Sequence, residues 1–237
     1  MPLDLWPKEF TIQSYINLIT NDITPIGKFF INSVITSLGT VLIAVILATF
    51  AGYALSRLNF KYRKSILMGI LTTQMFPLVV LLIPLYILYV KTNLLNTYTG
   101  LILAFTSFTL PFGIWMIKGF VDSVPVEIEE AAMVDGCTRF QSMRLVVFPL
   151  IIPGVVATGV FAFLDAWNNL LFPLTLINEV AMKTLPPGMI LAFGGEFKHD
   201  WSGMMAASVI VSIPVIVIFI VIQRYLVQGL TGGAVKG

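Results

Sequence analysis

The run 31–55, INSVITSLGTVLIAVILATFAGYAL, contains 25 residues and no charged side chain. A helix needs about 20 apolar residues to cross the hydrocarbon core of a bilayer. The run is continuous, unlike the alternating segments of about ten residues that form membrane β-barrels. It therefore predicts a membrane-spanning helix and, because lipid forbids unpaired backbone, an all-α fold.

Four further apolar runs of the same kind follow along the chain. They cover 66–90, 98–121, 150–177 and 204–228, with Lys118, Asp165 and Arg224 as their charged residues. The whole chain is 57% hydrophobic and 11% charged, which excludes a water-soluble monomer. We predict one transmembrane domain over 1–237, a polytopic bundle of five spans with long connections at 122–149 and 178–203.

Composition and motifs exclude several classes of function. The net charge of +2 and the lack of a long basic run argue against nucleic acid as a partner. Cys137 and His199 are single residues of their type, so no Cys- or multi-His metal centre is expected. No P-loop, G-x-S-x-G or H-E-x-x-H pattern occurs. We therefore expect no catalytic, cofactor-binding or metal-binding residues, and the alternative of a membrane-embedded transferase is less favoured.

Lysine and arginine residues in the connections predict the orientation of the spans. If the C-terminus is cytoplasmic, nine of these residues lie inside and five outside. The inside set is Arg57, Lys61, Arg63, Lys64, Lys118, Arg139, Arg144, Arg224 and Lys236. The outside set is Lys8, Lys28, Lys91, Lys183 and Lys198. This count favours a cytoplasmic C-terminus, with 122–149 inside and 178–203 outside.

The connection after the third span has the pattern of two short helices. It reads SVPVEIEEAAMVDGCTRFQSMRLVVFPL over 123–150. Ser123 can cap the first helix, Gly136 can end it in a left-handed conformation, and Thr138 with Gln141 can form a capping box for the second. From these residues alone, an amphipathic linker on the headgroups and a docking element for another protein are both open.

The same connection resembles the EAA motif of the permease subunits of ABC importers. The resemblance rests on Glu130-Ala131-Ala132, Asp135-Gly136 and Phe148-Pro149-Leu150. In that family the motif is a helix–turn–helix that docks in a groove of the ATP-binding subunit. The resemblance therefore implies a coupling role for Glu130, Ala131, Ala132, Asp135, Gly136 and Pro149.

Other segments extend the resemblance to the second permease subunit of maltose-type sugar importers. They include FTIQSYINL from Phe10, Met75-Phe76-Pro77, Trp167-Asn168-Asn169 and the ending 223–237. The resemblance implies a multi-pass protein of a bacterial or archaeal inner membrane. Its implied partners are a second permease, a dimer of ATPase subunits that bind ATP and Mg²⁺, a solute-binding protein, and a sugar. A polyol or glycerol phosphodiester is the alternative substrate. Family members usually have one more helix before Phe10. A truncated chain, a misassigned start and a member with five spans all stay open as reasons for its absence from this sequence.

Asp165 is the charge predicted to lie deepest in a span, roughly 22 Å from Leu150 along a helix. In a continuous helix Asn168 and Asn169 share its face, with Phe161 and Phe172 one turn away on either side. Carboxylate, amides and rings suit a sugar path, and they equally suit hydrogen bonds to the partner permease. Both interpretations stay open.

Two further patterns concern packing and the tail. Ala44, Ala48 and Gly52 form a stripe of small residues typical of close helix packing. Four glycines in the last nine residues argue against a stable free helix there. The resemblance implies that this tail contacts the ATPase dimer.

Overall fold

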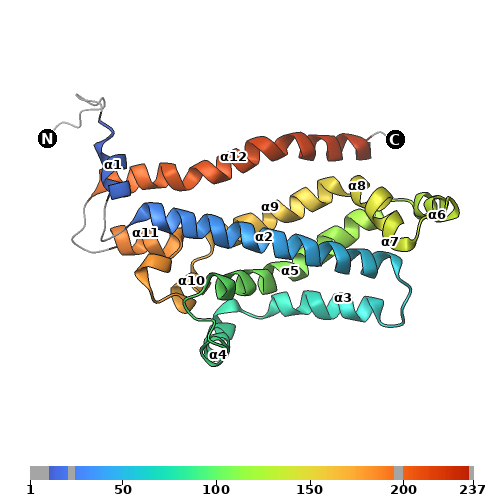
Figure 1. The fold of residues 1–237 in the computed structure, drawn as a ribbon, viewed down its shortest axis with the longest axis horizontal. Coiled ribbons are helices and arrows are strands. Elements are labelled where there is room, and N and C mark those ends of the chain that lie inside the picture. The colour runs from blue at the N-terminus through green and yellow to red at the C-terminus, as the bar shows by residue number, and fades with distance from the viewer. Residues whose placement is uncertain (1–10, 21–24, 195–199, 235–237) are drawn as a thin grey trace.

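The computed structural model describes residues 11–20, 25–194 and 200–234, with side chains up to Gln223, and these residues form helices and connecting turns without a strand (Figure 1). The first elements along the chain are α1 (Gln13–Thr20), α2 (Ile26–Arg57), α3 (Arg63–Thr72), η1 (Thr73–Met75) and α4 (Leu78–Lys91). Next come α5 (Tyr98–Asp122), α6 (Val126–Val134), α7 (Arg139–Ser142), the short π-helix η2 (Met143–Val147) and α8 (Phe148–Leu150). The last are α9 (Ile152–Asn168), α10 (Leu171–Leu176), η3 (Val180–Met182), α11 (Leu185–Phe193) and α12 (Trp201–Ala234). The expected all-α class is confirmed.

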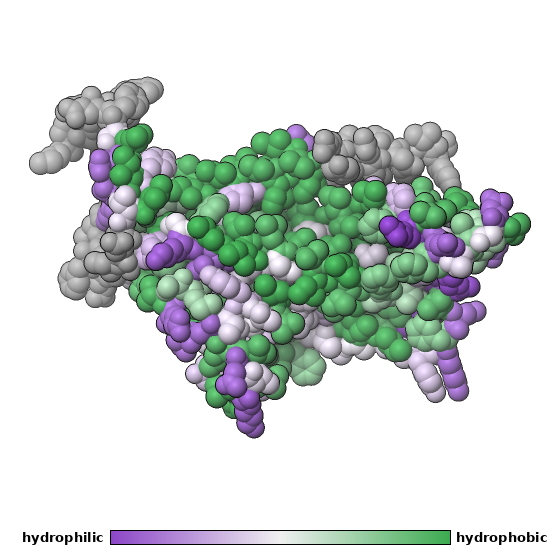
Figure 2. All heavy atoms as spheres, in the orientation of Figure 1, coloured by the Kyte–Doolittle hydropathy of each residue, from purple (hydrophilic) through white to green (hydrophobic). Residues whose placement is uncertain are grey.

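Helices α2, α5 and α9 form the centre of the bundle and run along its long axis (Figure 1). We call one end of the bundle the α6 end and the other the α11 end. Space-filling atoms are mainly hydrophobic between these ends, with hydrophilic groups gathered toward the ends (Figure 2). Large hydrophobic side chains that are exposed include Leu42, Val80 and Phe219. Such a surface suits contact with lipid and with other membrane helices.

Three of the expected spans are continuous helices that are long and apolar enough to cross a membrane: α2, α5 and α12. The expected span 66–90 is divided into two helical halves. Its two halves, 63–75 and 78–91, meet at an angle of 97°. Pro77 explains the break, because the residue before a proline is driven to extended backbone and Phe76 has φ −75° and ψ 127°. The α3–α4 pair can still serve as one broken span.

The expected span 150–177 is also interrupted. Its helix α9 begins at Ile152, meets the preceding segment 139–150 at 75°, and ends at Asn168. Asn169 has extended backbone, and the short helix α10 follows it. The side chain of Asn169 accepts a hydrogen bond from the Phe172 amide at 3.1 Å, which supplies a partner for the backbone at the break.

Helix α12 continues to Ala234, so 229–234 extend a longer helix and do not form a free one. Helix propagation costs less than nucleation, and this tail extends a helix already formed by the apolar run before it. Residues 235–237 lie outside the described residues, as do Phe10 and His199.

The small-residue stripe of α2 allows close packing at the centre of the bundle, as predicted. Ala44 and Ala48 are buried, and a Cβ on Gly52 would lie 2.7 Å from Ile117 Cγ2 of α5. A Cβ on Gly113 of α5 would lie 3.3 Å from the Ala48 Cβ. The backbones of α2 and α5 therefore approach each other more closely than larger side chains would permit.

This packing gives a first prediction. Gly52→Ala should lower the free energy of unfolding by about 1–3 kcal/mol, because the added methyl group is forced against α5. Gly69→Ala on α3 is the matched control, since a Cβ there meets nothing within 4 Å. The control should be neutral or stabilising by up to about 1 kcal/mol from helix propensity. Thermal unfolding of the purified variants measures both, and equal stabilities would contradict the close approach at Gly52.

Candidate functional site

The connection between α5 and α9 folds into the two short helices predicted from sequence. Helix α6 ends at Val134, and Gly136 has a φ of 95°, in the region that favours glycine. Thr138 and Gln141 form the predicted capping box at the start of α7. The expected cap at Ser123 is wrong: Ser123 ends α5, and Pro125 precedes α6.

The residues singled out as a coupling motif lie mainly on the exposed surface of this element. Glu130, Ala131, Asp135 and Gly136 are exposed, and Ala132 is half-buried. Pro149 is exposed on α8, separated from them by α7 and η2. Within the described part of the chain, Glu130 has no ion-pair partner. This surface is open to another protein.

The neighbouring residue Glu129 faces the opposite way and is buried, with 3% of its surface exposed. Arg57, the last residue of α2, places its Nε 2.9 Å from Glu129 Oε2. The Tyr53 hydroxyl donates to Glu129 Oε1, and Arg57 Nη2 donates to the Val124 carbonyl at 2.6 Å. We call Tyr53, Arg57, Val124 and Glu129 the inner clasp, because they fix the start of α6 to the end of α2.

The inner clasp was not predicted from the sequence. Arg57 is predicted only to lie on the cytoplasmic side, and of the two adjacent glutamates only Glu130 is predicted to be a site residue. A usable signal was present, because Ala132 and Met133 follow Glu129 at three and four residues and are also partly buried. That face could be assigned to the bundle only once the position of α2 was known.

A second clasp holds the opposite end of α2. Asn32 Nδ2 donates to the carbonyls of Ala181 and Lys183, both at 2.9 Å, and the Tyr98 hydroxyl donates to Asn32 Oδ1 at 2.7 Å. The Leu185 amide donates to Ser33 Oγ at 2.8 Å. We call Asn32, Ser33 and Tyr98, with the backbone groups they bind, the outer clasp. It fixes the segment 181–185 at the α11 end.

The predicted polar cluster of α9 lines a cavity of about 470 Å³. Asp165, Asn168, Asn169 and Phe161 all contribute to its wall. Thr109 Oγ1 of α5 donates to Asp165 Oδ2 at 3.0 Å, and Asn168 Nδ2 donates to the Leu164 carbonyl within its own helix. The cavity thus presents a carboxylate and amide groups beside an aromatic ring.

Two details of that cluster differ from the expectation. Asn169 lies beyond the end of α9, so it does not share a helical face with Asp165, although it reaches the same cavity. Phe172 is buried against Phe105 and Phe108, with ring centroids 5.9 and 4.9 Å apart, rather than flanking the polar face. Both differences follow from the helix break at Asn169.

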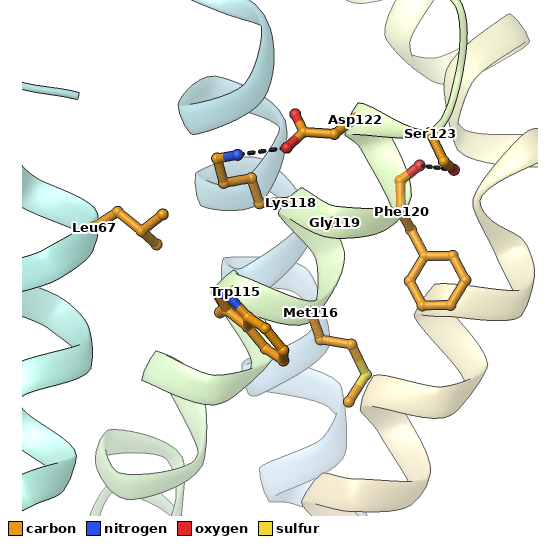
Figure 3. A pocket seen from close by; sticks show the side chains of 8 residues that line it. All are labelled: Leu67, Trp115, Met116, Lys118, Gly119, Phe120, Asp122 and Ser123. Atoms are coloured by element: carbon orange, nitrogen blue, oxygen red, sulfur yellow. Dashed lines mark hydrogen bonds and ion pairs between the residues drawn. The ribbon is translucent and has the colours of Figure 1, made fainter. Parts of the chain in front are cut away.

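A further cavity of about 430 Å³ lies on α5 near the α6 end (Figure 3). Leu67 of α3 forms one wall, Trp115, Met116 and Phe120 of α5 are apolar, and Lys118 pairs with Asp122 at the rim. The Phe112 ring lies 5.6 Å from Trp115 and 4.3 Å from Phe161. A line of rings therefore connects this cavity to the one beside Asp165.

Comparison with known proteins gives a family match over most of the chain. Residues 40–232 match the family described as binding-protein-dependent transport system inner membrane component. The diacetylchitobiose uptake system permease protein DasC of Streptomyces coelicolor is 40% identical over 87% of this chain and 74% of its own length. The sulfoquinovosyl glycerol transport system permease protein SmoH of Agrobacterium fabrum is 39% identical over 100% and 82%. The trehalose/maltose permease MalG of Thermococcus litoralis is 32% identical over 96% and 82%.

A solved structure confirms the fold. The chain superposes with a TM-score of 0.76 and 19% identity on a chain of a bacterial ABC transporter involved in the import of alginate. The match covers 92% of this chain and 81% of that one.

The opposite environments of the two glutamates give a second prediction. Glu129→Ala should cost about 3–5 kcal/mol of stability, because it leaves the buried guanidinium of Arg57 without its carboxylate. Glu130→Ala makes the same change one residue away and should alter stability by less than about 0.5 kcal/mol, as is usual for exposed positions. Thermal or chemical unfolding of the two variants tests this. Equal losses would show that the inner clasp does not stabilise the fold.

Proposed function

Because this chain belongs to the binding-protein-dependent transport system inner membrane components, we propose that it is a permease subunit of an ABC importer for a mono- or oligosaccharide. It translocates the sugar by alternating access and leaves ATP hydrolysis to separate subunits. The relatives named for diacetylchitobiose, sulfoquinovosyl glycerol and trehalose or maltose support a carbohydrate substrate. The observation that carries the proposal is the family match over 40–232, which includes the whole α6–α7 element.

In this proposal the α6 end faces the cytoplasm and the α11 end faces outward. The excess of lysine and arginine near the α6 end supports that orientation. The exposed residues Glu130, Ala131, Asp135 and Gly136 then meet the ATPase dimer, which binds ATP and Mg²⁺. The small side chains of Ala131 and Ala132 permit a close approach, and Glu130 is available for a basic group of the ATPase.

The sugar path runs beside Asp165 in this proposal. A carboxylate in a span is costly unless it faces a partner or a wet cavity, and Asp165 lines a cavity of about 470 Å³. Asp165, Asn168 and Asn169 offer hydrogen bonds to sugar hydroxyls. The rings of Phe161, Phe112 and Trp115 offer apolar faces against which pyranose C–H groups pack. The remaining partners are a second permease subunit, which completes the path, and an external solute-binding protein, which delivers the sugar.

The decisive experiment is uptake by the complete importer. The chain is reconstituted in proteoliposomes with its second permease, ATPase subunits and solute-binding protein, and accumulation is measured over a panel of labelled sugars. ATP-dependent accumulation of a saccharide that requires the binding protein is expected. ATP hydrolysis by the reconstituted importer without accumulation of any sugar of the panel would overturn the proposal.

The reversal at Gly136 gives a prediction for coupling. A side chain with φ near 95° costs roughly 1–2 kcal/mol, and it would displace the α6–α7 turn from its partner. Gly136→Val should abolish uptake and release or uncouple the ATPase while the spans remain folded. Gly136→Asn should retain more activity, because asparagine tolerates positive φ better than a β-branched residue. Uptake and membrane-bound ATPase activity are measured together, and wild-type values for Gly136→Val would contradict the coupling role.

The cavity beside Asp165 gives a separate prediction. Asp165→Ala should lower uptake at least tenfold, roughly the effect of losing one charged hydrogen-bond partner, while assembly with the second permease stays normal. Thr109→Val removes the hydroxyl donor but keeps the carboxylate, and it should reduce uptake much less. Co-purification of the two permeases reports assembly. Lost assembly with unchanged sugar selectivity would instead assign Asp165 to the permease interface.

A further inference from the structure

Helix α2 is held by buried polar contacts near both of its ends. One set of contacts lies at the α6 end of the bundle and the other at the α11 end. We propose that α2 transmits the conformational change between the coupling element and the outer segment 181–185. In this inference, which rests on the proposed function, Arg57 and Asn32 are positioning residues. They fix α2 to α6 at one end of the bundle and to the segment 181–185 at the other.

The inner clasp makes α6 follow α2. The side chains of Arg57 and Glu129 are 8% and 4% exposed, so their ion pair is shielded from water. Arg57 also binds the Val124 carbonyl, two residues before α6 begins. A tilt of α6 relative to α2 would leave a buried charge unpaired, which is much more costly than breaking a surface pair. The contact therefore resists independent movement of the two helices.

The outer clasp makes the segment 181–185, which leads into α11, follow α2. Asn32 and Ser33 are 3% and 1% exposed, and together they receive or donate three hydrogen bonds with the backbone of 181–185. Unmade buried hydrogen bonds are expensive, so this segment also stays attached when α2 moves. Tyr98 at the start of α5 completes the clasp through Asn32 Oδ1.

The helix between the clasps has the features of a stiff connector. The 25 residue steps from Asn32 to Arg57 correspond to about 38 Å of helix. No proline lies between them, whereas α5 and α12 contain Pro111 and Pro214. Buried Thr36 and Thr40 return their hydroxyls to carbonyls of the same helix, so they need no partner on a neighbouring helix. The covalent route through α5 to α6 instead includes the non-helical link 123–125.

The alternative is that both clasps only stabilise a static fold. Measurements of stability alone cannot separate a transmitting role from a static one, because both roles predict a lower free energy of unfolding on mutation. A nucleotide-dependent signal at the outer clasp does separate them, since a purely static contact does not respond to what the ATPase binds.

The test uses the complete importer in lipid nanodiscs, with and without a non-hydrolysable ATP analogue. Hydrogen exchange is followed in the peptide that covers 178–188. In the wild-type complex the analogue should change exchange in this peptide. Arg57→Lys, which keeps the charge but loses the fork of donors, should reduce that change roughly tenfold, within the range usual for coupling between two sites. Asn32→Asp, which loses both amide donors, should do the same.

Two further variants complete the design. Lys118→Gln removes the Lys118–Asp122 pair, whose side chains are 20% and 45% exposed and lie near the α6 end of the bundle, and it should leave the nucleotide response unchanged. The double variant Arg57→Lys with Asn32→Asp should be no worse than either single variant, because both interrupt one route. Co-purifying ATPase, measured for each complex, confirms that docking is retained.

Each outcome decides the question. A full nucleotide response in both single variants, a wild-type complex without a response, or a double variant whose losses add would overturn the role of α2. Sugar uptake by the same wild-type sample is measured separately. Failure of uptake with an intact exchange response would refute sugar import and leave the role of α2 standing. Normal uptake without the exchange response would support sugar import and refute the role of α2.

Discussion

The constraint on which this structure depends is that lipid offers no hydrogen bonds to an exposed backbone. Long helices meet it directly, and every departure from helix inside an apolar run needs a local partner. Just before the break between η1 and α4, the Thr73 hydroxyl donates to the Ile70 carbonyl at 2.6 Å. At the break after α9, Asn169 accepts from the Phe172 amide. The polar residues found within apolar segments are thus partly there to permit changes of direction.

The same constraint explains how far the sequence predicts the fold. Hydropathy located the helical segments well, because the length of an apolar run reports directly on burial in lipid. It did not report backbone angles, so the apolar runs 66–90 and 150–177 did not show how sharply the chain turns within them. Pro77 carried a signal for the first break, and Asn169 a weaker one for the second. The capping box at Thr138 and the positive φ at Gly136 were predictable because each depends on residues within one turn.

The site illustrates the opposite limit. Glu129 and Glu130 are adjacent and chemically identical, and only their position relative to α2 makes one buried and the other exposed. That relation joins residues 72 positions apart, which no local pattern reports. The cavity beside Asp165 lies between these cases. Its residues were predictable from one polar cluster in an apolar run, while the roles of Asn169 and Phe172 depended on a helix end that the pattern did not show.

The separation between Arg57 and Glu129 also has a consequence for biosynthesis. Seventy-two residues must be added after Arg57 before its partner exists, which takes about 4–14 s at ordinary rates of translation. During that time an unpaired guanidinium stands at the end of the newly made α2, where it is costly to bring into hydrocarbon. Until Glu129 has been added, the end of α2 therefore carries a charged group without its mature partner, and the inner clasp forms late in synthesis.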